Sequence, residues 1–264
     1  MTPIVWLRIG VRFVSLSAIT LIRLNVWLVG IPFTRSSPRA RGRWRDRQLR
    51  GWSRGLLRVL GGRVTCFGTP PRHPFLLVSN HLSYVDVMVL GSVVQGVFVA
   101  KSEVARWPFI GPLTRWGDTI FVDRGSRRSV PRALERIEEL IDAGDAVIVF
   151  PEGTSSPGVE VLPFTSPLLA VAARKLQPVS YATLTYATDA GEMPAHLSVC
   201  WWGDMTLVGH IVHLLSLKRF RATVIFGDEP LIDPDRKELA RRLRDAVAES
   251  FDPVVSAEEL CHEL

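Results

Sequence analysis

A histidine and an aspartate stand five residues apart, His81 and Asp86, in the segment NHLSYVD (80–86) that follows the apolar run 75–79. Imidazole suits a general base near neutral pH, and a carboxylate bonded to its other nitrogen fixes the tautomer. On a regular helix this spacing separates the two groups by about 140°, so they meet only if His81 precedes the helix. Ser83 and Asp86 also fit a capping box, in which Asp86 only starts a helix. Spacing alone leaves the dyad and the cap as equal alternatives.

A second candidate is the segment FPEGTSS (150–156), which ends the apolar run 146–150. Gly153 lets a loop approach a ligand closely, and the neighbouring hydroxyl groups are hydrogen-bond donors. The alternative is an ordinary strand-to-helix turn. No GxxxxGK phosphate loop is present, and Pro157 stands where a serine-hydrolase elbow needs its second glycine. The sequence therefore predicts no covalent serine intermediate.

A third candidate is Arg124 in FVDR (121–124). An arginine at a strand end can clamp a phosphate or a carboxylate with two hydrogen bonds, although a charged loop is as often only solvated. His210 and His213 are three residues apart but have no third ligand at a metal spacing, and the three cysteines show no CxxC pattern. We predict no metal site and no disulfide scaffold.

The elements that must position these residues alternate between short apolar runs and helical patterns. We expect strands at 75–79, 97–100, 119–122, 146–150, 179–186, 197–202 and 221–227. We expect helices at 84–94, 107–116, 130–143, 166–176, 205–217 and 234–250. The predicted fold class is α/β, with a mixed central sheet flanked by helices. Ligands bind at the carboxyl ends of such strands, where His81 and Glu152 stand.

The charge of the chain is divided unevenly between its two parts. Residues 1–63 carry 13 arginines and one acidic residue, a net +12, whereas residues 64–264 carry 19 basic and 25 acidic residues, a net −6. A basic region beside an apolar segment is typical of binding to an anionic membrane, and the acidic remainder argues against nucleic acid. We predict a membrane-associated helical segment at 1–63 and a catalytic domain at 64–264.

The apolar stretch 3–33 is interrupted by Arg8, Arg12 and Arg23, which fall in one narrow stripe of a helix. We expect this helix to lie in the membrane interface, with the arginine stems reaching lipid phosphates. A single tilted membrane span is the alternative, and the interrupting charges disfavour a cleaved signal peptide. In 35–63 arginine alternates with tryptophan and leucine, which favours an interfacial segment over a solvated basic linker.

Four blocks, NHLSYVD, FVDR, FPEGT and QPVS (177–180), stand in the order found in the glycerolipid acyltransferase superfamily, lysophosphatidate acyltransferase type. The chain resembles that family over residues 78–180. The resemblance implies that His81 is the general base and Asp86 its orienting partner. It implies a substrate-binding set that comprises Asn80, Arg124, Glu152, Gly153, Thr154, Ser155 and Pro178.

The resemblance further implies an O-acyltransferase that moves a fatty acyl group to the hydroxyl of a lysophospholipid of the 1-acylglycerol-3-phosphate type. The donor would be acyl-carrier protein (acyl-ACP) or coenzyme A (acyl-CoA), with no further cofactor. The site would lie on a lipid bilayer, at the cytoplasmic face of the bacterial inner membrane.

One departure from the family pattern concerns the acceptor. The third block of the family often continues with a phosphate-associated arginine after Thr154, whereas this chain has Ser155. Together with VLPFTSPLL (161–169) and WWGDM (201–205), this resembles the branch of lyso-ornithine lipid O-acyltransferases. That acceptor is one alternative, and a non-catalytic lipid-binding membrane protein is an alternative of a different class.

Overall fold

The computed structural model describes the chain except for residues 1, 35–36, 108–109, 124, 127 and 264. Its centre is a seven-stranded sheet in the order β1-β7-β6-β2-β5-β3-β4. Neighbouring strands are parallel except for β6 and β7, so the sheet is mixed, as the sequence predicts. The strands are β1 Gly62–Phe67, β2 Phe75–Ser79, β3 Val97–Lys101, β4 Ile120–Val122, β5 Ala146–Val149, β6 Val179–Thr188 and β7 Phe220–Phe226.

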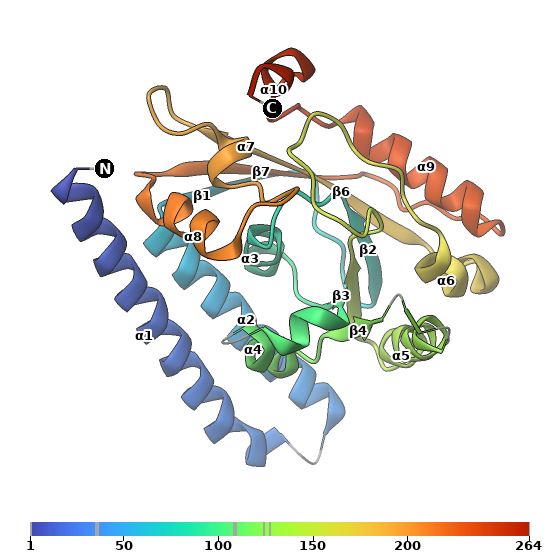
Figure 1. The fold of residues 1–264 in the computed structure, drawn as a ribbon. Coiled ribbons are helices and arrows are strands. Elements are labelled where there is room, and N and C mark those ends of the chain that lie inside the picture. Colours follow the sequence, from blue (N-terminus) through green and yellow to red (C-terminus); the bar gives the residue numbers. More distant parts are fainter. Residues whose placement is uncertain (1, 35–36, 108–109, 124, 127, 264) are drawn as a thin grey trace.

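Helices cover both faces of this sheet (Figure 1). On one face α2, α3 and α8 pack on alternate residues of β2 such as Leu77, and on the other α5, α6 and α9 pack on Leu76 and Val78. The helices are α1 Pro3–Thr34, α2 Pro38–Leu60, α3 Val85–Val93, α4 Ile110–Trp116, α5 Ser129–Asp142, α6 Ala170–Lys175, α7 Ala195–Ser198, α8 Leu207–Ser216, α9 Arg236–Glu249 and α10 Ala257–Glu263, with 3₁₀ turns at Ser102–Arg106 and Pro167–Leu169.

The strand predicted at 197–202 is wrong. Residues 195–198 form the short helix α7, and the N–H groups of Val199 and Cys200 both bond the carbonyl of Ala195. Both sides of β6 are already paired, with β2 and with β7, so no further strand can join the sheet there. Strand β1 and helix α10 lie outside the elements expected from the sequence, and the boundary expected after residue 63 falls within β1.

The N-terminal helix α1 lies along α2 at one side of the molecule (Figure 1). Its arginine stripe exists, but it faces protein rather than lipid phosphates, which corrects the expectation. Arg8 donates to the carbonyl of Ser216 at 2.7 Å, and Arg12 donates to carbonyls at the end of α8, including that of Leu215 at 3.0 Å. Arg23 bonds Gln48 on α2 at 3.3 Å. Arg8 and Arg12 turn inward because the last carbonyls of α8 have no partners within their own helix.

The opposite side of α1 is apolar and exposed. It carries Ile4, Trp6, Leu7, Val11, Phe13, Val14, Leu21, Ile22, Leu28, Val29 and Phe33. Among the described helices, α1 is the one long and apolar enough to cross a membrane by length and composition. An exposed apolar surface that runs along the whole length of a helix indicates membrane association.

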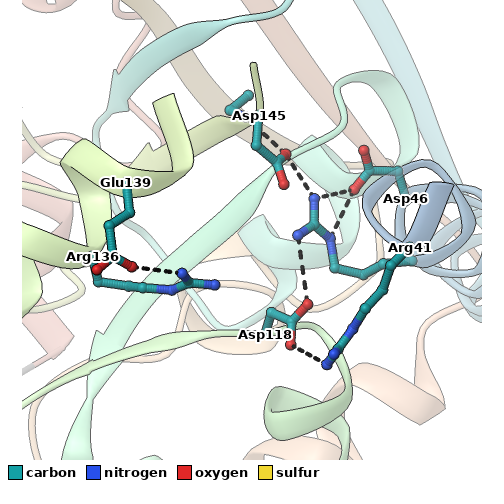
Figure 2. A network of polar contacts seen from close by, with 8 residues as sticks. Arg41, Asp46, Asp118, Arg136, Glu139 and Asp145 are labelled. Carbon is teal, nitrogen blue, oxygen red and sulfur yellow. Dashed lines mark hydrogen bonds and ion pairs between the residues drawn. The ribbon is translucent and has the colours of Figure 1, made fainter. Parts of the chain in front are cut away.

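A buried arginine joins α2 to the sheet. Figure 2 shows Asp46, Asp118 and Asp145 turned toward one guanidinium. The ion pairs identify this group as Arg45, which is 2% exposed. Its nitrogens lie 2.7 Å from Asp46, 2.8 Å from Asp145 and 3.7 Å from Asp118. Asp145 precedes β5, so this network fixes the basic helix against the strand that leads to the second candidate segment.

Candidate active site

His81 and Asp86 meet at the carboxyl end of β2. His81 lies in the loop before α3 begins at Val85, which is the arrangement their spacing requires. Nδ1 of His81 is 2.7 Å from Oδ2 of Asp86. The His81 side chain is 23% exposed and that of Asp86 is 0% exposed, so the carboxylate is enclosed while the imidazole remains accessible. With Nδ1 engaged, Nε2 is the ring nitrogen that can accept a proton.

The same carboxylate also starts α3. Oδ2 of Asp86 accepts the N–H groups of Leu82 at 2.7 Å and Ser83 at 3.0 Å, and Ser83 Oγ accepts the N–H of Val85 at 3.2 Å. Helix α3 begins after Tyr84, which makes no side-chain capping bond, so the predicted capping box is only partly formed, by the Ser83 N–H bond to Asp86, beside the His81–Asp86 contact. The cap orients the carboxylate, and the carboxylate in turn holds the imidazole.

The second candidate segment packs against the first. The ring of Phe150 stacks on the ring of His81, with centroids 4.3 Å apart and an interplanar angle of 18°. The N–H of Ser156 donates to the carbonyl of His81 at 3.1 Å. Gly153 has φ of 67°, a conformation that favours glycine, and closes the turn onto the Phe150 carbonyl. Two segments far apart in the sequence thus form one site.

Glu152 lies in this turn as a buried acid, 7% exposed. Neither of its carboxyl oxygens has a hydrogen-bond partner among the described residues. Burial raises the pKa of Glu152 from 4.5 to about 8, and backbone groups at His81 and Leu162 oppose this rise without reaching hydrogen-bonding geometry. The charge of Asp86 adds to the rise of the pKa, so Glu152 is mostly neutral at pH 7.

Aromatic side chains border the loop that contains Ser155. Ser155 Oγ donates to the carbonyl of Trp201, whose own N–H bonds the Leu82 carbonyl at 2.9 Å. The ring of Trp201 meets Tyr84 edge to face at 6.0 Å and Trp107 at 5.5 Å. Sequence reasoning missed Trp201 as a site residue because it assigned 197–202 to a strand, although WWGDM (201–205) resembles the lyso-ornithine lipid branch.

Other predicted substrate-binding residues lie differently. Asn80 is buried, and its amide exchanges two hydrogen bonds with the backbone of Leu184, at 2.8 Å and 2.7 Å. Thr154 is exposed on the loop. Pro178 precedes β6, whose Val179 pairs with Leu76 at the amino end of β2, so the structure does not bring Pro178 to His81. Arg124 lies outside the described residues.

Two further tyrosines reach the site, Tyr186 from a segment that sequence reasoning did not single out and Tyr84 from within NHLSYVD. The hydroxyl of Tyr186 on β6 donates to Oδ1 of Asp86 at 2.6 Å. The hydroxyl of Tyr84 lies 2.9 Å from Nδ1 of His210 on α8, and burial lowers the pKa of His210 to about 4. Tyr186 belongs to no recognisable motif, and only its place in an alternating apolar pattern marks it as inward-facing.

The arrangement is an accessible imidazole held by a buried carboxylate beside a glycine-containing loop, which suits proton abstraction from a hydroxyl. The family model Acyltransferase matches residues 63–184. The chain is similar to a lyso-ornithine lipid O-acyltransferase of Rhodobacter capsulatus, 36% identical over 197 residues, which are 72% of this chain and 70% of that protein. A second protein of that name, from Brucella abortus, is 33% identical, with 90% and 94% of the two chains covered.

The chain is also similar to a 1-acyl-sn-glycerol-3-phosphate acyltransferase of Neisseria gonorrhoeae, 28% identical over 89% of this chain and 92% of that one. Among solved structures, the 1-acyl-sn-glycerophosphate acyltransferase PlsC of Thermotoga maritima superimposes with a TM-score of 0.56. That match covers 90% of this chain and 97% of PlsC at 20% identity, and it shows a shared fold.

Proposed function

The chain belongs to the acyltransferase family and acts on lysolipids, and from this membership we propose that it esterifies the hydroxyl of a lyso-ornithine lipid. The observation that carries this choice of acceptor is the environment of Ser155. Serine is uncharged, so the position after Thr154 offers no positive charge to a phosphate. Its hydroxyl donates to the carbonyl of Trp201. Four relatives at 32–36% identity bear the name of this acceptor, which supports the proposal.

In the proposed reaction, Nε2 of His81 takes the proton of the acceptor hydroxyl, and the oxygen attacks the carbonyl carbon of the acyl thioester. The carbon–sulfur bond breaks, and the imidazolium returns its proton to the leaving thiolate, so that an ester and a free thiol result. Asp86 holds the tautomer and stabilises the imidazolium. The thioester is that of acyl-ACP or acyl-CoA, and its reactivity allows positioning and deprotonation to suffice.

We also propose that the enzyme lies on the cytoplasmic face of the bacterial inner membrane, with α1 in the interface. The pairing of α1 with α2 supports an interfacial position over a tilted span. Helix α2 is rich in arginine along the length that packs on α1, and a spanning α1 would carry those charges into the hydrocarbon.

The acceptor is tested by incubating the full-length protein in lipid vesicles with labelled acyl-ACP or acyl-CoA and either lyso-ornithine lipid or 1-acylglycerol-3-phosphate. We expect diacylated ornithine lipid, identified by mass spectrometry, and a loss of at least about 100-fold in the His81→Ala control. Ester formed on the phosphate acceptor alone would overturn the proposed acceptor while leaving the family intact.

A second acceptor, 1-acylglycerol-3-phosphate, is favoured by the relative from Neisseria gonorrhoeae, which bears the name of that acceptor and which this chain matches over 92% of its length. Ser155→Arg separates the two. A guanidinium near an ornithine headgroup repels its ammonium, so we expect lower kcat/KM on lyso-ornithine lipid and equal or higher kcat/KM on the phosphate acceptor. Identical ratios of the two rates in mutant and wild type would show that Ser155 does not face the headgroup.

A further inference from the structure

The two oxygens of Asp86 are held in different ways. Oδ2 accepts hydrogen bonds from three donors in its own loop, including Nδ1 of His81. Oδ1 accepts the hydroxyl of Tyr186 at 2.6 Å, its one hydrogen bond within the described part of the chain. Asp86 is 0% exposed, so bulk water cannot take the place of that donor if it is lost.

Tyr186 arrives from β6, 100 residues along the chain from Asp86. It is 2% exposed, and its ring packs edge to face on Phe220 of β7, with centroids 6.1 Å apart. Burial and the charge of Asp86 raise the pKa of Tyr186 well above its ordinary value. The phenol therefore stays protonated across the neutral range and can act only as a donor toward the carboxylate.

We propose that Tyr186 is a positioning residue for acyl transfer, whose hydroxyl holds Oδ1 of Asp86 and so keeps Oδ2 aligned with Nδ1 of His81. This rests on the proposed roles of His81 and Asp86. The hydrogen bond has a second consequence. A carboxylate that shares its negative charge with a phenol proton attracts an imidazolium less strongly, so loss of the Tyr186 hydroxyl should strengthen the attraction of Asp86 for a proton on His81.

Two other titratable groups face this pair. Glu152 comes from the turn after β5 and Cys200 from the segment after α7. Burial raises the pKa of both, with the charge of Asp86 adding to it, so both are largely neutral below pH 7.5. In that range Glu152 and Cys200 add little charge beside Asp86, so the effect of removing the Tyr186 hydroxyl is measured against a nearly constant electrostatic background.

The test compares Tyr186→Phe with the wild type in purified, full-length protein between pH 5 and pH 7.5. Phenylalanine keeps the ring on Phe220 and removes only the hydroxyl. The first measurement is kcat/KM for lysolipid acylation, and the second is the titration of His81 followed by the ¹³C signal of its Cε1. Tyr181→Phe is the matched control, since Tyr181 lies on the other face of β6, where it packs against the second core cluster, which contains Leu76 and Val78 of β2.

We expect Tyr186→Phe to raise two midpoints by roughly half to one pH unit. One is the midpoint of the acidic limb of the plot of kcat/KM against pH, and the other is the midpoint of the ¹³C titration of His81. At pH 6 this lowers kcat/KM by about three- to tenfold, and the deficit shrinks as pH rises. Tyr181→Phe leaves both midpoints in place. Added to Asp86→Asn, Tyr186→Phe has little further effect on rate, because it acts through the carboxylate.

Replacement of Tyr186 by 3-fluorotyrosine keeps the ring and the hydroxyl and strengthens the donor, so we expect both midpoints to move downward. This second variant decides the matter if Tyr186→Phe does not fold. Unmoved midpoints, or an equal loss of rate at every pH, would overturn the role of Tyr186. If His81→Ala retained activity, the proposed mechanism would fail instead, and the titration of His81 would still report on Tyr186.

Discussion

Asp86 contacts His81 through one oxygen and Tyr186 through the other, while its loop N–H bonds start α3. Asp86→Asn keeps acceptor capacity for the loop but removes the charge that stabilises an imidazolium. We expect kcat/KM to fall about 10²–10⁴-fold with a small change in melting temperature, measured by acylation kinetics and thermal unfolding. Ser83→Ala is the control for the cap, and it should cost about 1 kcal/mol of stability with a near-normal rate. Near-normal turnover in Asp86→Asn would refute the dyad.

Glu152 links stability to pH. Its pKa is raised by burial from 4.5 to about 8, so the folded state favours the neutral acid. The resulting stabilisation is fully present below about pH 4.5 and is lost as pH rises through about 8, with a slope of up to about 1.4 kcal/mol per pH unit.

Glu152→Gln removes the titration, so we expect its free energy of unfolding to fall less between pH 5 and pH 8 than that of the wild type. Denaturant unfolding at several pH values measures this difference. Glu138→Gln, a substitution of a glutamate on α5 whose pKa is lowered by Lys175, serves as the control. Parallel curves for wild type and Glu152→Gln would mean that Glu152 is already ionised in the folded protein.

At the scale of elements, α2 depends on the guanidinium of Arg45, which compensates Asp46 and Asp145 in a buried setting. Arg45→Ala leaves those carboxylates without a partner, and we expect a loss of roughly 3–5 kcal/mol in the free energy of unfolding. Arg41, whose side chain is 56% exposed and lies 3.5 Å from Asp118, is the matched control. Arg41→Ala should cost less than about 1 kcal/mol, and equal costs for the two variants would show that the network adds no stability.

At the scale of the whole molecule, the exposed face of α1 is the expected membrane contact. Leu7, Val14 and Leu21 stand seven residues apart on that face. The triple variant Leu7→Glu, Val14→Glu, Leu21→Glu should lose vesicle binding in a flotation assay while its melting temperature changes little, because these side chains are 58–69% exposed in the folded protein.

The control for that variant lowers the net charge of the protein by the same three units, through Arg236→Glu and Lys237→Gln. Both residues lie on α9, on the side of the sheet away from α1 (Figure 1). It should bind vesicles as the wild type does. Vesicle binding that survives the three glutamates would place the main anchor outside α1.

The sequence by itself determined the features that depend on neighbouring residues. The strands 75–79 and 146–150 are continuous apolar runs, and the structure has β2 and β5 there. The spacing of His81 and Asp86 set the condition for their contact, that His81 precede the helix, and the start of α3 at Val85 meets it. The arginine stripe of α1 follows from helical periodicity in the same way.

Only the tertiary structure decided what these local features face. An alternating pattern shows which side of a strand is buried but not which strand lies beside it, so the bond from Tyr186 to Asp86 and the stacking of Phe150 on His81 had no sequence signal. The arginines of α1 were expected at lipid phosphates, because the pattern cannot reveal the free carbonyls at the end of α8. Such contacts join segments of independent sequence, and they form only when the whole core packs.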